Sequence, residues 1–340
     1  MLRILHQNDL KSYVSVRKGE TKIGERLRTL RKNETLNALS SYAHRGCRFV
    51  VLGIPESVGP ITNMGRGGAE KAWEPFLRSF VNVQSNRFLS GENILLLGSF
   101  DLSDIQSRAE ALEPNAAYYY QKLHMLVAEI DELVLPVIQA IVEAGLIPIV
   151  IGGGHNNAYP LLAGTALGLN RKRGINAINM DAHADFRALE GRHSGNGFSY
   201  AKERGYLQKY FAFGLHQSYN SDNMLIAMDG TRNVQYEMLE DITYLDKRLM
   251  GAINYVHDEH VPCGIELDMD AIRLMPSSAI SPSGFSLEQG RHYVRKCVKS
   301  LKTAYLHLPE AAPQTEHEAR LVGKALTYLV TDYIKAYPST

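Results

Sequence analysis

The segment INAINM (175–180) runs directly into DAHAD (181–185), and this junction decides the fold prediction. Its first six residues are of strand length and mostly apolar, which is typical of a strand buried on both faces of a parallel sheet. Asp181, His183 and Asp185 then follow where that strand would end. Open α/β sheets bind their ligands outside the carboxyl ends of their strands. The junction therefore predicts a polar site at one edge of a parallel sheet.

Six other segments have the same length and apolar character, and helical patterns lie between them. The predicted strands cover residues 49–53, 94–98, 147–153, 210–214, 264–270 and 304–308, and the predicted helices cover 116–144, 286–301 and 318–334. Within the helices, Pro136 predicts a kink or a break, and Ser286 three residues before Gln289 resembles a capping box. This alternation predicts a doubly wound α/β fold, with a mainly parallel sheet flanked by helices on both faces.

The composition is that of an ordinary globular enzyme. The chain has 340 residues, of which 45% are apolar and 21% charged, and its formal net charge of +1 indicates neither a nucleic-acid nor a membrane partner. Three cysteines are too few for a disulfide framework or a cysteine-based zinc site. The first residues lack a secretory signal pattern, so we expect a cytoplasmic protein. We expect one domain over residues 46–340, preceded by an N-terminal extension over residues 1–45.

Metal-ligand residue types follow three of the predicted strands. They are His155 after GGG (152–154), then Asp181, His183 and Asp185, then Asp268 and Asp270. In an extended segment residues two apart point the same way, so Asp181 and His183 could face one side, as could Asp268 and Asp270. Four carboxylates and two imidazoles at one sheet edge repel one another unless cations bind between them. Solvated turn residues are the alternative, but three such motifs at three strand ends favour a site for two divalent ions, with Mn²⁺, Zn²⁺ or Fe²⁺ suited to mixed ligands.

The three motifs GGGH, DAHAD and DMD, in this order and at these separations, resemble those of the arginase/agmatinase/formimidoylglutamase superfamily. Gly53-Ile54-Pro55, Ser194-Gly195-Asn196 and Glu310 are similar to further segments of that family. The resemblance implies an arginase-like three-layer sandwich and two Mn²⁺ ions that activate a bridging water. It assigns His155 and Asp185 to one ion, His183 and Asp270 to the other, and Asp181 and Asp268 to both. It also implies that Asp185 and Glu310 take part in catalysis and that Ser194, Asn196 and Glu310 face the substrate.

The residue after DAHADF is Arg187, and it indicates the substrate class. Arginases have Asn here, whereas the DAHxDxR form resembles formimidoylglutamases. An arginine grips a carboxylate through two charge-assisted hydrogen bonds, which suits an amino-acid-derived small molecule. The resemblance thus implies hydrolysis of N-formimidoyl-L-glutamate to L-glutamate and formamide. The alternative for Arg187 is an ion pair with a nearby acid such as Glu190.

The chain also departs from the family pattern. Phe198 stands where arginases carry a proton-relaying His, and Arg273 and Leu274 replace a usual Asp-Pro. His193 and His216 are candidate proton donors in its place, with His193 the one we assign to catalysis. These departures leave arginase or another guanidino-acid hydrolase as the alternative enzyme, with agmatinase disfavoured because Arg187 would repel a cationic substrate. A non-catalytic metal-binding homologue is the alternative of another class. A homo-oligomer is compatible with everything in the sequence.

Overall fold

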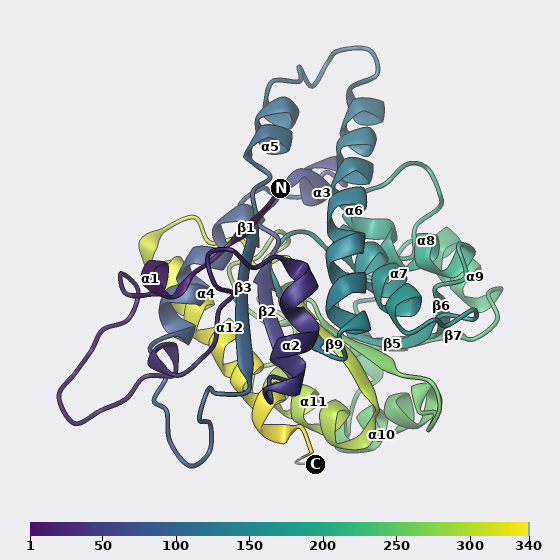
Figure 1. Ribbon diagram of the computed structural model, residues 1–340. Helices are drawn as coiled ribbons and strands as arrows, with labels where there is room; N and C mark the ends of the chain where they lie inside the picture. Colours follow the sequence, from purple (N-terminus) through teal and green to yellow (C-terminus); the bar gives the residue numbers. More distant parts are fainter. Residues whose placement is uncertain (339–340) are drawn as a thin grey trace.

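A single sheet of nine strands runs through the centre of the computed structural model, which describes residues 1–338 (Figure 1). The strands are β1 (Leu2–Ile4), β2 (Phe49–Gly53), β3 (Ile94–Phe100), β4 (Ile147–Ile151), β5 (Ile175–Met180), β6 (Leu207–Leu215), β7 (Val234–Met238), β8 (Cys263–Leu267) and β9 (Thr303–Leu308). Their order in the sheet is β1-β3-β2-β4-β9-β8-β5-β6-β7. Only β1 pairs antiparallel to its neighbour among the described strands, so the expectation of a mainly parallel sheet is confirmed.

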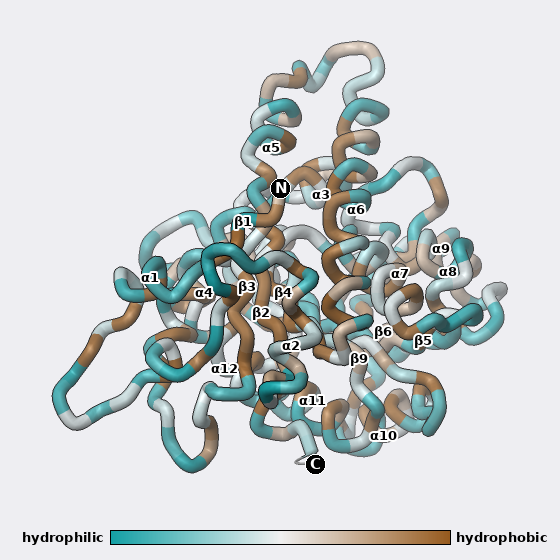
Figure 2. The backbone as a smooth tube through the Cα atoms, viewed as in Figure 1, coloured by the Kyte–Doolittle hydropathy of each residue, from teal (hydrophilic) through white to brown (hydrophobic). Residues whose placement is uncertain are grey.

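Helices cover both faces of this sheet because its strands are apolar on both sides. Along β2, Val51 packs into one hydrophobic layer while Val50 packs into the other. Figure 2 shows the central strands β2 and β3 mainly in the brown of hydrophobic residues. The first layer is closed by α4 (Trp73–Phe80), α10 (Leu245–Val256), α11 (Leu287–Ser300) and α12 (Glu316–Ala336). The second is closed chiefly by α2 (Leu39–His44), α5 (Ser103–Glu110), α6 (Tyr119–Glu143), α7 (Ala158–Gly168) and α8 (Gly197–Glu203). The three-layer α/β sandwich is therefore confirmed.

The three predicted helices are present as α6, α11 and α12, with ends that differ by up to three residues from the predicted ones. Helix α6 continues through Pro136, so the chain does not break there. Val134, Val137 and Ile138 on either side of the proline are buried, and this packing keeps the helix together despite the lost backbone hydrogen bond. At the start of α11 the Ser286 side chain accepts from the backbone N–H of Gln289, and the expected capping box is formed.

Residues 1–45 pack against the same core as the rest of the chain. Strand β1 pairs with β3 through Leu2 and Phe100, and Leu10, Ile23 and Leu27 are buried in the first hydrophobic layer. None of the helices in the described residues is both long and apolar enough to cross a membrane.

The sheet order positions the site. Strands β4, β9, β8 and β5 are consecutive neighbours and parallel, so their carboxyl ends meet at one edge. Three of these four strands run into the metal-ligand motifs, and β9 runs into Pro309 and Glu310.

Candidate metal centre

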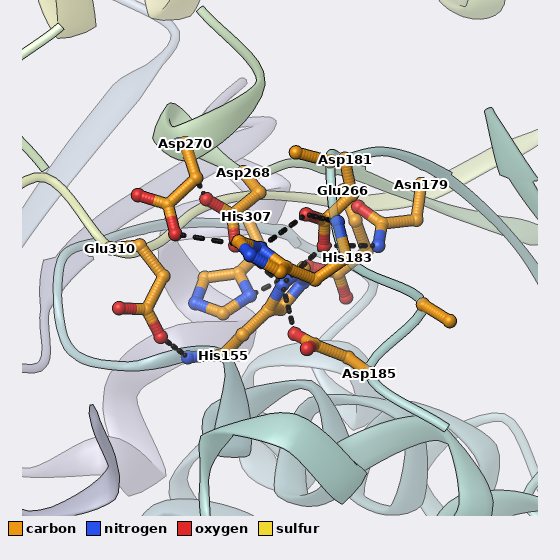
Figure 3. Close-up of polar contacts among 12 residues, drawn as sticks. His155, Asn179, Asp181, His183, Asp185, Glu266, Asp268, Asp270, His307 and Glu310 are labelled. Atoms are coloured by element: carbon orange, nitrogen blue, oxygen red, sulfur yellow. Dashed lines mark hydrogen bonds and ion pairs between the residues drawn. The ribbon is translucent and has the colours of Figure 1, made fainter. Parts of the chain in front are cut away.

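The carboxyl ends of four neighbouring strands bring the predicted ligands together (Figure 3). The 3₁₀ turn His155–Asn157 follows β4, and the segments beginning with Asp181 and Asp268 follow β5 and β8. Glu310 follows β9, which lies between β4 and β8. The four motifs therefore share one edge although they are spread over more than a hundred residues of sequence.

Tight turns, not strand alternation, set the direction of the ligand pairs. Strands β5 and β8 end at Met180 and Leu267, so neither Asp-x-His nor Asp-x-Asp lies within a strand. One carboxylate oxygen of Asp181 accepts from the His183 N–H at 2.8 Å, and one of Asp268 accepts from the Asp270 N–H at 2.6 Å. An Asp that accepts from the N–H two residues on closes a turn locally. The expectation of extended geometry here is wrong, and the turns are what gather the side chains.

His155 and three carboxylates form the tightest group. The His155 Nδ1 atom lies 2.9 Å from Asp185 Oδ2, 2.9 Å from Asp268 Oδ2 and 3.2 Å from Asp181 Oδ2. Atoms at neighbouring corners of an octahedron, each about 2.1 Å from a small divalent cation, are about 3 Å apart. All four side chains are buried, and their separations fit one enclosed ion.

The residues expected at a second ion are more loosely arranged. His183 Nδ1 lies 3.7 Å from both Asp181 Oδ1 and Asp270 Oδ2, and 29% of the His183 side chain is exposed. Asp270 is fixed by the Ala279 N–H at 3.0 Å and by the Ser278 hydroxyl at 3.2 Å. This half of the centre is open to the adjoining cavity.

The pKa shifts of the predicted metal ligands indicate that positive charge would be stabilised between them. Burial raises the pKa of Asp268 well above its ordinary value, and the carboxylates of Asp181 and Asp270 raise it further. Burial alone would lower the pKa of His183, but Asp181 and the other carboxylates outweigh it and raise that pKa to about 10. Both shifts express an excess of negative charge among these side chains. Divalent cations remove this excess, and His and carboxylate donors suit Mn²⁺.

A cavity of about 240 Å³ opens onto the centre. Its walls include His183, Asp185, Asp268, Asp270 and Glu310. Asp185 and Glu310 have backbone φ angles of 46° and 66°, which non-glycine residues adopt at a cost. In each case the conformation turns a carboxylate toward the other side chains of the centre.

Glu310 is held from several sides. Its N–H donates to the Gly153 carbonyl at 2.8 Å, and its Oε1 accepts from the His155 N–H at 2.7 Å. Its Oε2 is buried and has no hydrogen-bond partner among the described residues. Burial and the charge of Asp270 raise the pKa of Glu310 to about 8. A cationic group in the cavity would counter both effects and keep the carboxylate charged.

Arg187 and Ser194 also line the cavity. Arg187 Nε lies 3.1 Å from Glu190 Oε1, which is the ion pair weighed as the alternative for this arginine. Both side chains are about half exposed, so this pair leaves the remaining guanidinium nitrogens free to bind a ligand.

Three other candidate residues are not part of the wall of this cavity, as far as the described residues show: Asn196, His193 and His216. Asn196 is buried, and its carboxamide binds Arg192 and the backbone of its own loop. His193 accepts from the Gly195 N–H through Nδ1, and burial lowers its pKa to about 4. Because Nδ1 is engaged by the backbone of its own loop, this geometry favours a loop-stabilising role for His193.

Tyr219 was not predicted from the sequence. Its ring stacks on His183 at a centroid distance of 5.4 Å and on His216 at 4.7 Å, and it lines the cavity. Tyr219 thus contacts both a predicted metal ligand, His183, and the candidate proton donor His216. The only hint in the sequence was that this loop follows a predicted strand, at the edge where the ligands lie.

The comparisons with known proteins agree with this architecture. The arginase family model matches residues 47–333. Formimidoylglutamase from Streptococcus pyogenes is 25% identical over 312 residues, which cover 87% of this chain and 88% of that protein. Formimidoylglutamase from Bacillus subtilis has a TM-score of 0.71 at 16% identity, covering 96% of this chain and 95% of that one. Formiminoglutamase from Trypanosoma cruzi, solved with Mn²⁺, has a TM-score of 0.69 at 17% identity, covering 94% and 100%.

The two solved structures share the fold, and the family model spans most of the chain, including the ends of all four strands that form the centre. The chain therefore belongs to the arginase family and is a hydrolase of that family.

Proposed function

We propose that the chain hydrolyses an amidine C–N bond at a centre of two Mn²⁺ ions, with N-formimidoyl-L-glutamate as substrate and L-glutamate and formamide as products. The observation that carries this proposal is the buried group of His155, Asp181, Asp185 and Asp268 beside a cavity that also contains Glu310 and Arg187. The ions, when bound, would lower the pKa of a water held between them and so supply a nucleophile at neutral pH.

The side chains of the cavity have separate tasks in this proposal. Glu310 Oε2 accepts from an amidinium N–H and holds the reacting carbon over the centre. Asp185 accepts the proton that the water loses as its oxygen adds to that carbon. The C–N bond to the amino-acid nitrogen then breaks, and that nitrogen takes up the proton. Balanced this way, one water is consumed and no other reactant is needed.

The far end of the cavity favours a substrate with carboxylates. Arg187 offers unpaired guanidinium N–H groups toward the cavity, and a carboxylate can accept two of them in parallel. The related formimidoylglutamases support the same substrate. Glu190 beside Arg187 favours the second candidate, a guanidino acid such as arginine, because its carboxylate would suit a free α-ammonium group.

A panel assay tests the proposal. Purified protein reconstituted with Mn²⁺ should release formamide from N-formimidoyl-L-glutamate with a kcat/KM at least tenfold above that for arginine, agmatine or guanidinobutyrate. A preference for arginine would establish the second candidate. A preference for agmatine, which has no carboxylate, would contradict the role given to Arg187. No turnover of any of them by protein that holds two ions would support a non-catalytic homologue.

Arg187→Ala is expected to raise KM for N-formimidoyl-L-glutamate about ten- to a hundredfold, because a lost charge-assisted hydrogen bond costs about 1.5–3 kcal/mol. The melting temperature should change little, since the exposed pair with Glu190 contributes about 0–1 kcal/mol. Arg187→Lys should recover only part of the affinity, because an ammonium lacks the planar fork. Steady-state kinetics and thermal unfolding on the same samples provide both measurements.

Glu190→Gln is the matched control, because it removes the same ion pair and leaves Arg187 in place. Its KM should stay within about threefold of wild type. Equal KM changes in both variants would mean that the pair, and not a contact between Arg187 and substrate, matters.

A further inference from the structure

Three buried polar side chains lie directly behind His155, on the side away from the cavity. Glu266 on β8 accepts from the Tyr305 hydroxyl at 2.6 Å through Oε1 and lies 2.6 Å from His307 Nδ1 through Oε2. All three side chains are fully buried. Burying the Glu266 carboxylate costs free energy unless hydrogen bonds compensate for its lost hydration.

The register of β8 against β9 brings these three side chains together. Glu266 pairs in register with His307, and Gly264 pairs with Tyr305, so the side chains of Glu266, Tyr305 and His307 rise from the same face of neighbouring strands. A Cβ on Gly264 would come within 2.3 Å of the Tyr305 ring. The glycine therefore makes the space in which the Tyr305 ring can reach Glu266.

The two ring nitrogens of His155 face different surroundings. Nδ1 faces the carboxylates of Asp185 and Asp268, both at 2.9 Å, within the candidate metal centre. Nε2 faces Glu266 Oε2 at 3.4 Å and has no hydrogen-bond partner among the described residues. A histidine that binds a metal through one nitrogen usually donates its other N–H to a carboxylate or carbonyl, which fixes its tautomer and its orientation.

We propose that Glu266, held in place by Tyr305 and His307, is a positioning residue that accepts the Nε2–H of His155 and so directs the Nδ1 lone pair at the metal ion. A shift of a few tenths of an ångström shortens the 3.4 Å separation to a normal hydrogen bond. The proposal rests on the metal centre described above, since without an ion His155 needs no particular tautomer.

The alternative to the positioning role is that the same side chains bind a metal ion themselves. His155, Glu266 and His307 also lie close enough to hold an ion between them. Against this, Glu266 already accepts from Tyr305 and faces His307, and His155 would have to bind ions through both ring nitrogens. The positioning role uses each nitrogen once, and counting the bound ions separates the two ideas.

The experiment is a calorimetric Mn²⁺ titration of metal-stripped, full-length protein and of its Glu266→Gln variant. Gln keeps the size of the side chain but has one acceptor oxygen, so it cannot serve both Tyr305 and the two histidines. We expect the affinity for one of the two ions to fall about ten- to a hundredfold. Wild-type protein that binds three ions per chain, with one lost in Glu266→Gln, would overturn the proposal in favour of a metal site at Glu266.

Two tyrosine variants separate positioning from general stability. Tyr305→Phe removes the hydroxyl that the Glu266 carboxylate accepts from, whereas Tyr293→Phe removes an equally buried hydroxyl that donates to the backbone carbonyls of Ile178 and Glu266. Both should lower the melting temperature of metal-free protein. Only Tyr305→Phe should weaken Mn²⁺ binding, by about three- to tenfold, and this comparison stands even if Glu266→Gln fails to fold.

Unchanged Mn²⁺ affinities in Glu266→Gln, or equal affinities in the two tyrosine variants, would overturn the positioning role. Neither result would affect the proposed function. That function would fail on different grounds, if wild-type protein bound no Mn²⁺ or hydrolysed none of the amidines.

Discussion

Asp181→Asn is expected to lower kcat/KM by about three orders of magnitude or more and to release most of the bound metal. Both oxygens of Asp181 face candidate ligands: Oδ2 lies 3.2 Å from His155 Nδ1, and Oδ1 lies 3.7 Å from His183 Nδ1. If two ions bind as proposed, Asp181 could therefore serve as a ligand to both. An amide in its place removes one negative charge and one ligand oxygen. A bound metal lowers the activation free energy by several kcal/mol, so its loss should lower the rate by a factor of this size. Elemental analysis and steady-state kinetics on the same protein measure both effects.

Asp332→Asn is the matched control for this prediction. Asp332 is also a buried aspartate, but it pairs with Arg291 and Arg295 on the helical layer away from the centre. Its variant should unfold at a lower temperature and keep its metal and its rate. Chelation of wild-type protein should reproduce the Asp181→Asn defect, and added Mn²⁺ should restore activity only in the wild type. Full activity in the metal-stripped protein would defeat the metal mechanism altogether.

The sequence predicted the parts of the fold that depend on local pattern. Continuous apolar runs at 49–53 and 175–180 are strands because they are buried on both faces, and both strands begin and end at the predicted residues. The polar motifs that follow the strands come together because parallel strands in one sheet share a carboxyl edge. Short motifs at strand ends therefore carry information about three-dimensional position.

Other features depend on which strands are neighbours, and the sequence alone does not contain that order. Strand β9 lies between β4 and β8, and this order places Glu310 against the backbone of His155. Strand alternation suggested how the ligand pairs point, but the Asp side chains close turns instead. Asn196 looked like a substrate residue by resemblance, yet its carboxamide is used by Arg192, whose burial no local pattern indicated.

The packing behind the metal ligands was equally hidden. Glu266 lies about forty residues before Tyr305 and His307 in the sequence, and all three sit within predicted strands. Only the register of β8 against β9 shows that they form one group. The one indication in the sequence was Glu266 itself, which lies within a predicted strand and two residues before the predicted ligand Asp268.

Glu310→Gln is expected to lower kcat/KM for N-formimidoyl-L-glutamate by about thirty- to a thousandfold, or about 2–4 kcal/mol, with metal content unchanged. The backbone of Glu310 is fixed in a left-handed conformation between the Gly153 carbonyl and the Ser278 N–H, and Oε1 is engaged by the His155 N–H. Only Oε2 is left for a ligand. A glutamine can still accept from His155 through its oxygen, and it then presents an amide N–H, instead of a negative oxygen, to the amidinium.

N-formyl-L-glutamate separates loss of charge recognition from damage to the loop, because its neutral carbonyl replaces the cationic amidine while its two carboxylates remain. As a competitive inhibitor it should bind the wild type and Glu310→Gln within about threefold, since it presents no cation for Glu310 to recognise. If the substrate and this analogue lose affinity equally, Glu310 only shapes the cavity. If the substrate alone suffers, the negative charge at Oε2 recognises the amidinium. That strained, buried carboxylate would then be the feature that selects amidines over neutral amides.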